Sequence, residues 1–152
     1  MDYHIKDLPK NLKELNAFAL RWKEEKTSLP VYAIVKPNFK DSSANELTKS
    51  VIWDFVNVRG GAAYRINNGA VYDAKRKAYR KGSVRKGVPD IIGVLDGRFF
   101  GIEIKYGRDK QSADQRTVEL EIQSAGGTYF IAKTYEDYLN KINDVCKNWS
   151  KQ

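Results

Sequence analysis

The stretch Val88 to Lys105, VPDIIGVLDGRFFGIEIK, constrains the fold of this chain more than any other. It contains two apolar runs joined by Asp96-Gly97, a dipeptide that favours the positive-φ turn of a two-residue β-hairpin. A turn at this position fixes the register of the two strands, because each step away from it pairs the next two residues. The sequence therefore predicts an antiparallel hairpin with Asp90 opposite Glu103.

This register gathers charged side chains on one face of the hairpin. Residues directly opposite each other share a face, with Cβ atoms roughly 4.5–5.5 Å apart, and side chains alternate along a strand. Asp90, Glu103 and Lys105 should therefore lie together, with Val88 opposite Lys105. Two opposed carboxylates destabilise a strand pair unless a cation lies between them. Because Mg²⁺ needs only one or two protein carboxylates beside its waters, the pattern indicates a divalent-metal site.

The same charges also have a purely structural interpretation. Asp90 follows Pro89 and can open a strand as a turn residue, while Glu103 and Lys105 can occupy a solvated face. The metal site is favoured because both strands are otherwise almost wholly apolar, and such strands are usually buried on both faces. Charged residues in buried strands seldom lack a partner.

Val88-Pro89-Asp90 followed by Glu103-Ile104-Lys105 resembles the two-part signature of the PD-(D/E)XK nuclease superfamily. More narrowly, the chain is similar to the VRR-NUC (virus-type replication and repair nuclease) family. The features that indicate this family are Glu46 in an early helix, Gly87 before the signature and Gln115 after it. The resemblance implies an α/β fold with a restriction-endonuclease-like αβββαβ core, in which helices flank a mixed four-stranded sheet.

The resemblance also implies an activity, that of a Mg²⁺- or Mn²⁺-dependent DNA endonuclease leaving a 5′-phosphate and a 3′-hydroxyl. The catalytic residues that it implies are Asp90, Glu103, Lys105, Glu46 and Gln115. The implied metal ligands are Asp90, Glu103, the Ile104 carbonyl and Glu46. Lys105 would orient or deprotonate the attacking water, and we expect it to orient the water and stabilise charge. Similar stand-alone nucleases are often dimers that cut branched DNA such as four-way (Holliday) junctions, so we expect a homodimer and a branched or double-stranded DNA substrate.

Glu46 and Gln115 each have a second possible role as helix caps. Ser43-Ala44-Asn45-Glu46 and Ser112-Ala113-Asp114-Gln115 both match the capping box, in which the fourth side chain returns to the backbone amide of the serine. For Glu46, capping and metal binding can compete for one side chain.

Positive charge is concentrated between Gly60 and Gly87. The chain has a net charge of +8. This segment contains the eight Lys and Arg residues named below and only one acidic residue, Asp73. A basic run beside a candidate metal site favours a polyanionic partner, although such a run is often only a solvated loop. Tyr64, Tyr72 and Tyr79 within it could stack on bases or pack internally. The expected nucleic-acid-binding residues are Arg65, Lys75, Arg76, Lys77, Arg80, Lys81, Arg85 and Lys86.

Composition narrows the chemistry and the compartment. His4 is the only histidine and Cys146 the only cysteine, which argues against histidine catalysis and excludes an internal disulfide and a multi-cysteine zinc site. We expect Cys146 to be a small core residue of the last helix. No apolar run is long enough to span a bilayer, and the N-terminus lacks the apolar core of a signal peptide. We therefore expect an intracellular, cytoplasmic protein without a membrane segment, in a phage-infected or bacterial cell by resemblance.

Periodicity and turn residues predict the remaining elements. The expected domains are an N-terminal helical extension, residues 1–40, and a nuclease domain, residues 41–152. The extension could pack on the domain, bind a partner or form a dimer contact. The expected helices span 11–25, 43–58, 112–125 and the stretch after Thr134. Besides the two strands of the central hairpin, strands are expected at 62–66 and 128–132. The basic segment should form a long loop, and residues 31–35 an edge strand or an extended connection.

Two other functions stay open at this point. The chain could be a non-enzymatic nucleic-acid-binding module in which the acids are structural. It could also be a nuclease of the same chemistry that acts on RNA or on plain duplex DNA. The acids favour a nuclease over a binding module, because carboxylates repel phosphate unless a cation intervenes.

Overall fold

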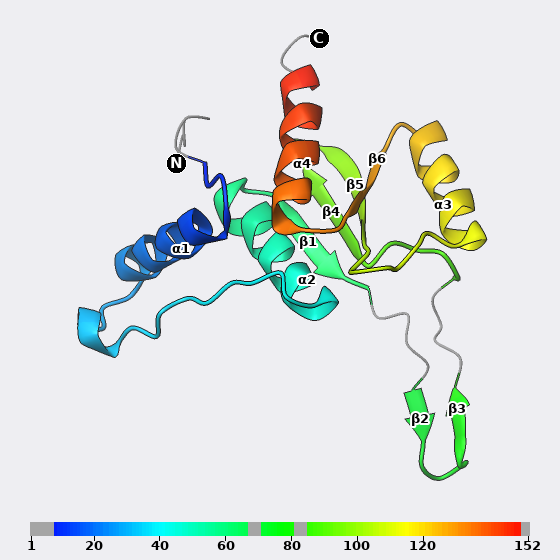
Figure 1. Cartoon of the computed structure of the whole chain (residues 1–152), viewed down its shortest axis with the longest axis horizontal. Helices are drawn as coiled ribbons and strands as arrows, with labels where there is room; N and C mark the ends of the chain where they lie inside the picture. The colour runs from blue at the N-terminus through cyan, green and yellow to red at the C-terminus, as the bar shows by residue number, and fades with distance from the viewer. Residues whose placement is uncertain (1–7, 67–70, 81–84, 150–152) are drawn as a thin grey trace.

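The structure, a computed structural model, describes residues 8–66, 71–80 and 85–149. Within these residues the main sheet has four strands in the order β1-β4-β5-β6 (Figure 1). β1, β4 and β5 are antiparallel neighbours, and β6 runs parallel to β5. The expected mixed four-stranded sheet is therefore confirmed. Its strands are Ala62–Arg65 (β1), Ile91–Leu95 (β4), Arg98–Ile104 (β5) and Thr128–Ala132 (β6).

β4 and β5 form the hairpin that the Asp96-Gly97 turn predicts. Both turn residues have positive φ, 49° and 74°, as a type I′ turn requires. Leu95 pairs with Arg98, and the register continues to Ile91 opposite Ile102. Because one further step brings residue 90 opposite residue 103, the predicted register is confirmed.

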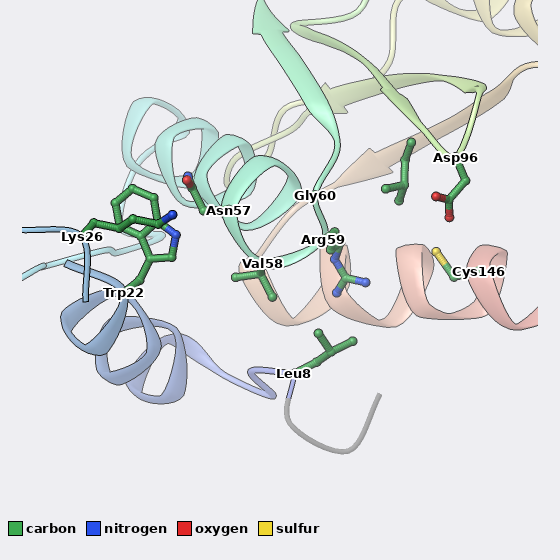
Figure 2. A pocket seen from close by; sticks show the side chains of 10 residues that line it. Leu8, Trp22, Lys26, Asn57, Val58, Arg59, Gly60, Asp96 and Cys146 are labelled. Carbon is green, nitrogen blue, oxygen red and sulfur yellow. The ribbon is translucent and has the colours of Figure 1, made fainter. Parts of the chain in front are cut away.

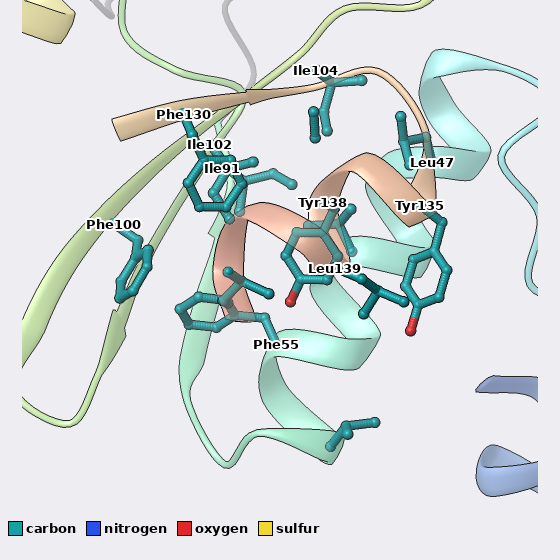
Figure 3. Close-up of a cluster of buried hydrophobic side chains, with 14 of the residues drawn as sticks. Leu47, Phe55, Ile91, Phe100, Ile102, Ile104, Phe130, Tyr135, Tyr138 and Leu139 are labelled. Atoms are coloured by element: carbon teal, nitrogen blue, oxygen red, sulfur yellow. The ribbon is translucent and has the colours of Figure 1, made fainter. Parts of the chain in front are cut away.

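Two helices cover the face of the sheet that holds the hydrophobic core (Figure 3). They are α2 (Ala44–Trp53), which continues as a π-helical turn at Asp54–Val58, and α4 (Tyr135–Trp149). Their apolar side chains pack against the residues of β4 and β5 that point to this face. The core side chains, all buried, include Leu47, Val51, Phe55, Ile91, Phe100, Ile102, Ile104, Tyr138, Leu139 and Ile142.

α3 (Ala113–Ser124) packs on the opposite face of the sheet. A Cβ placed on Gly101 would lie 3.1 Å from Ile122 Cδ1, so α3 approaches the side of β5 to which residue 101 points. Side chains alternate along a strand, so Glu103 points to that same side, away from Ile102 and the core. The fold therefore directs this carboxylate toward α3.

α1 (Leu12–Lys26) matches the predicted N-terminal helix and belongs to the same core. Leu15 and Ala19 are fully buried, and the Phe18 ring meets the Trp53 ring edge-on at a centroid distance of 6.2 Å. α1 therefore packs against the outer side of α2. None of the helices in the described residues is long and apolar enough to cross a membrane.

Two expectations about irregular segments were wrong. The basic segment is not simply a loop: β2 (Val71–Asp73) and β3 (Ala78–Arg80) form a separate two-stranded hairpin, which projects from the body of the molecule in Figure 1. The stretch 31–35 is neither an edge strand nor wholly extended, because Val31–Ala33 form a 3-10 turn. The strands β2 and β3 are three residues long and carry no periodic signal, and a short apolar run such as VYAIV does not distinguish a strand from a helical turn.

A buried polar network ties the π-helical turn to α4. The Asp54 carboxylate is fully buried and accepts hydrogen bonds from Arg59 Nε at 2.6 Å, Tyr135 OH at 2.9 Å and Tyr138 OH at 2.6 Å. Arg59 also donates through Nη1 to Asn143 Oδ1 at 3.0 Å. A buried carboxylate needs such partners, because burial of an unpaired charge is costly.

Candidate functional site

Asp90 is fixed by main-chain hydrogen bonds where three strands end. Its carbonyl oxygen accepts a hydrogen bond from Ile66 N at 2.7 Å, which continues the pairing of β1 with β4. Its carboxylate Oδ2 accepts from Ile104 N at 2.8 Å, which ties it to the end of β5. The side chain is half-buried, so one carboxylate is held rigidly at this edge of the sheet.

Glu103 is the most unusual residue of the site, because its carboxylate is buried, 2% exposed, and incompletely hydrogen-bonded. Oε1 accepts from Lys105 Nζ at 3.1 Å and from Gln115 Nε2 at 2.6 Å. Oε2 is buried and accepts no hydrogen bond from a donor within the described residues; a side-chain hydrogen bond between Glu103 and Asp90 requires one of the two carboxyls to be protonated. Burial raises the pKa of Glu103 to about 7, and the Asp90 charge adds to this while Lys105 opposes it.

Gln115 caps α3, as predicted, and also contacts Glu103. Its backbone amide donates to Ser112 Oγ at 3.2 Å, and its Oε1 accepts from Ser112 N at 2.8 Å, so the predicted capping box of α3 is confirmed. Its Nε2 donates to Glu103. The two roles do not compete, because an amide side chain has a separate acceptor and donor. The hydrogen bond from Ser112 N to Gln115 Oε1 thus fixes the Gln115 amide, and its Nε2 in turn orients the Glu103 carboxylate.

These side chains surround a pocket of about 270 Å³. It lies where the ends of β1, β4 and β5 meet the N-terminal turns of α2 and α3. Lys105 is nearly buried, with 7% exposed, whereas Arg65 is exposed. The lining residues are Ala44, Thr48, Arg65, Asp90, Glu103, Ile104, Lys105, Asp109 and Gln115.

Glu46 is not brought to this pocket. Its backbone amide donates to Ser43 Oγ at 3.2 Å, as the predicted helix start requires, but its carboxylate pairs with Lys49 Nζ at 3.0 Å. Ala44 and Thr48 line the pocket, and Glu46 lies about 200° around the helix from each of them. A role for Glu46 in metal binding therefore stays a prediction that this geometry does not support.

Sequence reasoning missed three polar residues beside the pocket. Asp109 and Thr48 line it, and Asn45 Oδ1 accepts from Arg65 Nη1 at 2.6 Å. Asp109 belongs to a loop and has no periodicity that could have placed it. Thr48 could have been found, because the helical spacing from Ala44 puts both residues on one face of α2.

The structure separates the expected nucleic-acid-binding residues into different groups. Lys75, Arg76 and Lys77 are exposed at the turn between β2 and β3. Arg85 instead makes a two-pronged ion pair with Glu121 of α3, with both N–O distances 2.7 Å. Arg65 lines the pocket, Lys86 is exposed, Arg80 ends β3, and Lys81 lies outside the described residues.

The tyrosines in this region and Cys146 can also be placed. Tyr64 on β1 is 65% exposed, so it is not packed internally. Tyr72 and Tyr79 are exposed on the β2–β3 hairpin. Cys146 is half-buried and packs against the core, as expected.

A larger pocket, about 500 Å³, lies at the other end of β4 (Figure 2). Asp96 of the β4–β5 turn, Arg59, Cys146 and Trp22 are among its lining residues. None of the candidate catalytic residues lines this pocket. Size alone therefore does not identify the site, and the chemistry of the smaller pocket is the more informative feature.

The residues of the smaller pocket fit a hard divalent cation. Asp90 and Glu103 bring two carboxylates together, and Glu103 Oε2 has an unused acceptor site that is shielded from water. In the described residues no group of three or more His, Cys, Asp or Glu side chains is arranged to hold a metal. Mg²⁺ does not require such a group, because it usually keeps several waters beside one or two carboxylates.

Comparison of the sequence with models of known protein families and with curated proteins finds no match.

Proposed function

We propose that this protein is a Mg²⁺- or Mn²⁺-dependent DNA endonuclease with a restriction-endonuclease-like core. The observation that carries the proposal is Glu103: its Oε2 is buried, unpartnered and close to a second carboxylate, beside Lys105 and Gln115. A buried acid of this kind is costly to the fold unless a ligand compensates it. The order Asp90, Glu103, Lys105 in the sequence, which resembles the PD-(D/E)XK signature, supports the same chemistry.

Asp90 and Glu103 would hold the cation, with Ile104 at the same edge of the pocket. A divalent cation supplies charge stabilisation for the phosphate oxygens and makes bound water more acidic. The 2.8 Å hydrogen bond from Ile104 N holds Asp90 Oδ2, and the bond from Gln115 holds Glu103 Oε1. The two carboxylates are thus oriented before any ligand binds, as electrostatic catalysis requires.

The cationic residues of the pocket would act on the substrate. The Lys105 ammonium, held by Glu103 at 3.1 Å, would orient the attacking water and donate to a phosphate oxygen. Arg65 is exposed and tethered to Asn45, so it can donate to a neighbouring phosphate. In hydrolysis, the attacking water gives up a proton to solvent and its oxygen forms a bond to phosphorus, the bond from phosphorus to O3′ breaks, and the leaving oxygen takes a proton from solvent to become the 3′-hydroxyl.

The basic hairpin and Arg65 favour a nucleic-acid substrate, because their cations can neutralise phosphates, and the resemblance to DNA nucleases favours DNA. We extend the proposal to branched DNA, such as four-way junctions, and to a homodimer whose symmetry would place two sites for two cuts. Light scattering measures the molar mass of the protein in solution and so distinguishes a monomer from a dimer. A monomer at micromolar concentration would remove the dimer from the proposal.

The first experiment is cleavage of labelled four-way junction, splayed-arm and plain duplex DNA in Mg²⁺, Mn²⁺ or EDTA. We expect cutting with either metal, none in EDTA, and a preference for the junction. Lys105→Ala should abolish cleavage, and Lys13→Ala, which removes the same charge from an exposed position on α1, should not. Asp90→Ala should also abolish cleavage but keep or tighten DNA binding, since it removes a charge that repels phosphate.

Three results would change the proposal. Cutting at the wild-type rate by Asp90→Ala would show that the metal-site assignment is wrong. Tight binding of DNA without cutting would favour a binding module. Cleavage of RNA, or of one short duplex sequence, in preference to the junction would assign the same chemistry to another substrate.

A further inference from the structure

We infer that the β2–β3 hairpin is a base-stacking arm, and that Tyr72 and Tyr79 contact unpaired nucleobases of the substrate. The inference rests on the proposed function and deepens it, because it selects DNA with unpaired bases beside the cleaved bond. The residues that carry it were not needed to build the catalytic pocket.

The two tyrosines lie directly opposite each other on one face of the hairpin. Tyr72 pairs with Tyr79 in the antiparallel register, and their ring centroids are 5.2 Å apart at an interplanar angle of 62°. Such a cross-strand aromatic pair stabilises a short hairpin. The pair still leaves Tyr72 53% and Tyr79 73% exposed. Internal packing therefore uses only part of the aromatic surface, and the remainder faces solvent.

Positive charge accompanies these rings at the tip of the hairpin. The Asp73 carboxylate accepts from the backbone amides of Lys75 and Arg76 at 3.0 and 3.3 Å, and Lys77 has a φ of 48°. These contacts shape a tight turn whose three consecutive cations, Lys75, Arg76 and Lys77, are exposed. A surface that alternates aromatic faces with cations is the pattern of single-strand binding, in which bases stack on rings while cations contact the backbone.

The substrate class follows from the accessibility of base faces. In a continuous duplex each base face is covered by its neighbour, so an aromatic ring can stack only at an end, a branch point or a single-stranded arm. Phosphate contacts alone would not distinguish these structures from plain duplex. A hairpin that used only its cations would therefore bind all DNA alike, whereas stacking gives a preference for unpaired bases.

The experiment measures binding separately from cleavage. In the Asp90→Ala background and without metal, the affinity is measured for a splayed-arm DNA, a four-way junction and a blunt duplex long enough that its two terminal pairs are a small fraction of the binding sites. The test variant is Tyr72→Leu with Tyr79→Leu, which keeps an apolar cross-strand pair but removes both aromatic faces. The matched control is Tyr32→Leu, the same change at a tyrosine that is 91% exposed in the α1–α2 connection.

We expect the double leucine variant to bind the splayed-arm DNA at least about tenfold more weakly, and to bind the blunt duplex within about twofold of the parent. A double phenylalanine variant, which keeps both rings, should bind like the parent. Tyr32→Leu should not change any affinity. 2-Aminopurine placed in the unpaired arm should be quenched by the parent and not by the leucine variant, because quenching requires stacking.

Other outcomes would overturn the inference. Equal weakening on splayed-arm and blunt DNA would show that the hairpin contacts phosphates only. Unchanged binding of the splayed arm would show that the rings do not contact bases. Cleavage by the wild-type protein tests the proposed function independently of the inference. If the wild-type protein cuts DNA and the leucine variant binds the splayed arm as tightly as the parent, the nuclease stands and the stacking arm does not. Selective binding of the splayed arm by the parent, together with no cutting by the wild-type protein, would support the stacking arm and remove the nuclease.

Discussion

At the scale of single residues, Glu103 determines how the metal-free site responds to pH. Its pKa is raised from the ordinary 4.5 to about 7, chiefly by burial and then by Asp90. Between about pH 4.5 and pH 7, Glu103 therefore keeps a proton in the folded protein that it has already released in the unfolded chain. The free energy of unfolding should fall as the pH rises from about 4.5 to about 7, and stay low above that range.

Glu103→Gln tests this dependence, because glutamine imitates the protonated acid. In metal-free buffer near pH 8 we expect the variant to be more stable than the wild type by ~1–3 kcal/mol, and the difference should narrow as the pH falls toward 5. Urea denaturation across this pH range measures it. Saturating Mg²⁺ should stabilise the wild type and not the variant. A stability difference that does not vary with pH would contradict the assignment of the titration to Glu103.

Gln115 gives a second prediction, since one side chain caps α3 and orients Glu103. We expect Gln115→Ala to lower the rate of cleavage and the Mg²⁺ affinity by about 10–100-fold, as removal of a residue that orients a metal ligand commonly does. Ser112→Ala is the matched control: it removes the cap alone, at a cost of about 1 kcal/mol in stability, and should leave cleavage within about twofold. An equal fall in activity in both variants would mean that Gln115 acts only through the helix cap.

At the scale of elements, the exposed turn of the β2–β3 hairpin should contribute to the salt dependence of DNA binding. Replacing Lys75, Arg76 and Lys77 by alanine should weaken binding and reduce the slope of log affinity against log salt by about 0.9 for each phosphate that is no longer neutralised. Replacing Lys13, Arg21 and Lys26 on α1 removes the same charge from another exposed surface and should change the slope little. An identical slope in the hairpin variant would show that this turn does not contact phosphate.

How far the sequence predicted the elements depended on local signals. The β4–β5 register was predictable because Asp96-Gly97 admits few turn geometries, and the face of α2 because its apolar residues recur with helical spacing. The β2–β3 hairpin was not, because its strands are three residues long and its turn lacks glycine. Such a short element depends on a pairing that no periodicity announces.

The site itself was predicted only where it lies on regular structure. Alternation along β4 and β5 was enough to place residues 90, 103 and 105 on one face. The Glu103–Gln115 hydrogen bond joins β5 to α3. The capping pattern predicted the bonds of Gln115 to Ser112 within α3, but not its bond to Glu103. Glu46 was expected at the site from resemblance, but α2 turns Ala44 and Thr48 toward the pocket, and the Glu46 carboxylate pairs with Lys49 of the same helix. Contacts between elements depend on packing angles, which a sequence pattern does not contain.

At the scale of the whole molecule, α1 contributes to the core on which α2 and the sheet also depend. Leu15 is fully buried in that core, so Leu15→Ala should lower the free energy of unfolding by ~2–5 kcal/mol. Leu120→Ala, the same change at a site 64% exposed, should cost less than about 0.5 kcal/mol. Circular dichroism and tryptophan fluorescence should report one shared transition. Two separate transitions would show that residues 1–40 fold as an independent extension.

The segment between Ile66 and Asp90, which connects β1 to β4, is called the excursion here. The hydrogen bond from Ile66 N to the Asp90 carbonyl closes the excursion at its base. The chain leaves the sheet and returns to it at two adjacent, paired positions. Since the entropy of closing a loop rises only slowly with its length, insertions or deletions within this excursion need not disturb the paired positions. The excursion can therefore diverge as a replaceable cassette during evolution, while selection on the acids at its base proceeds independently.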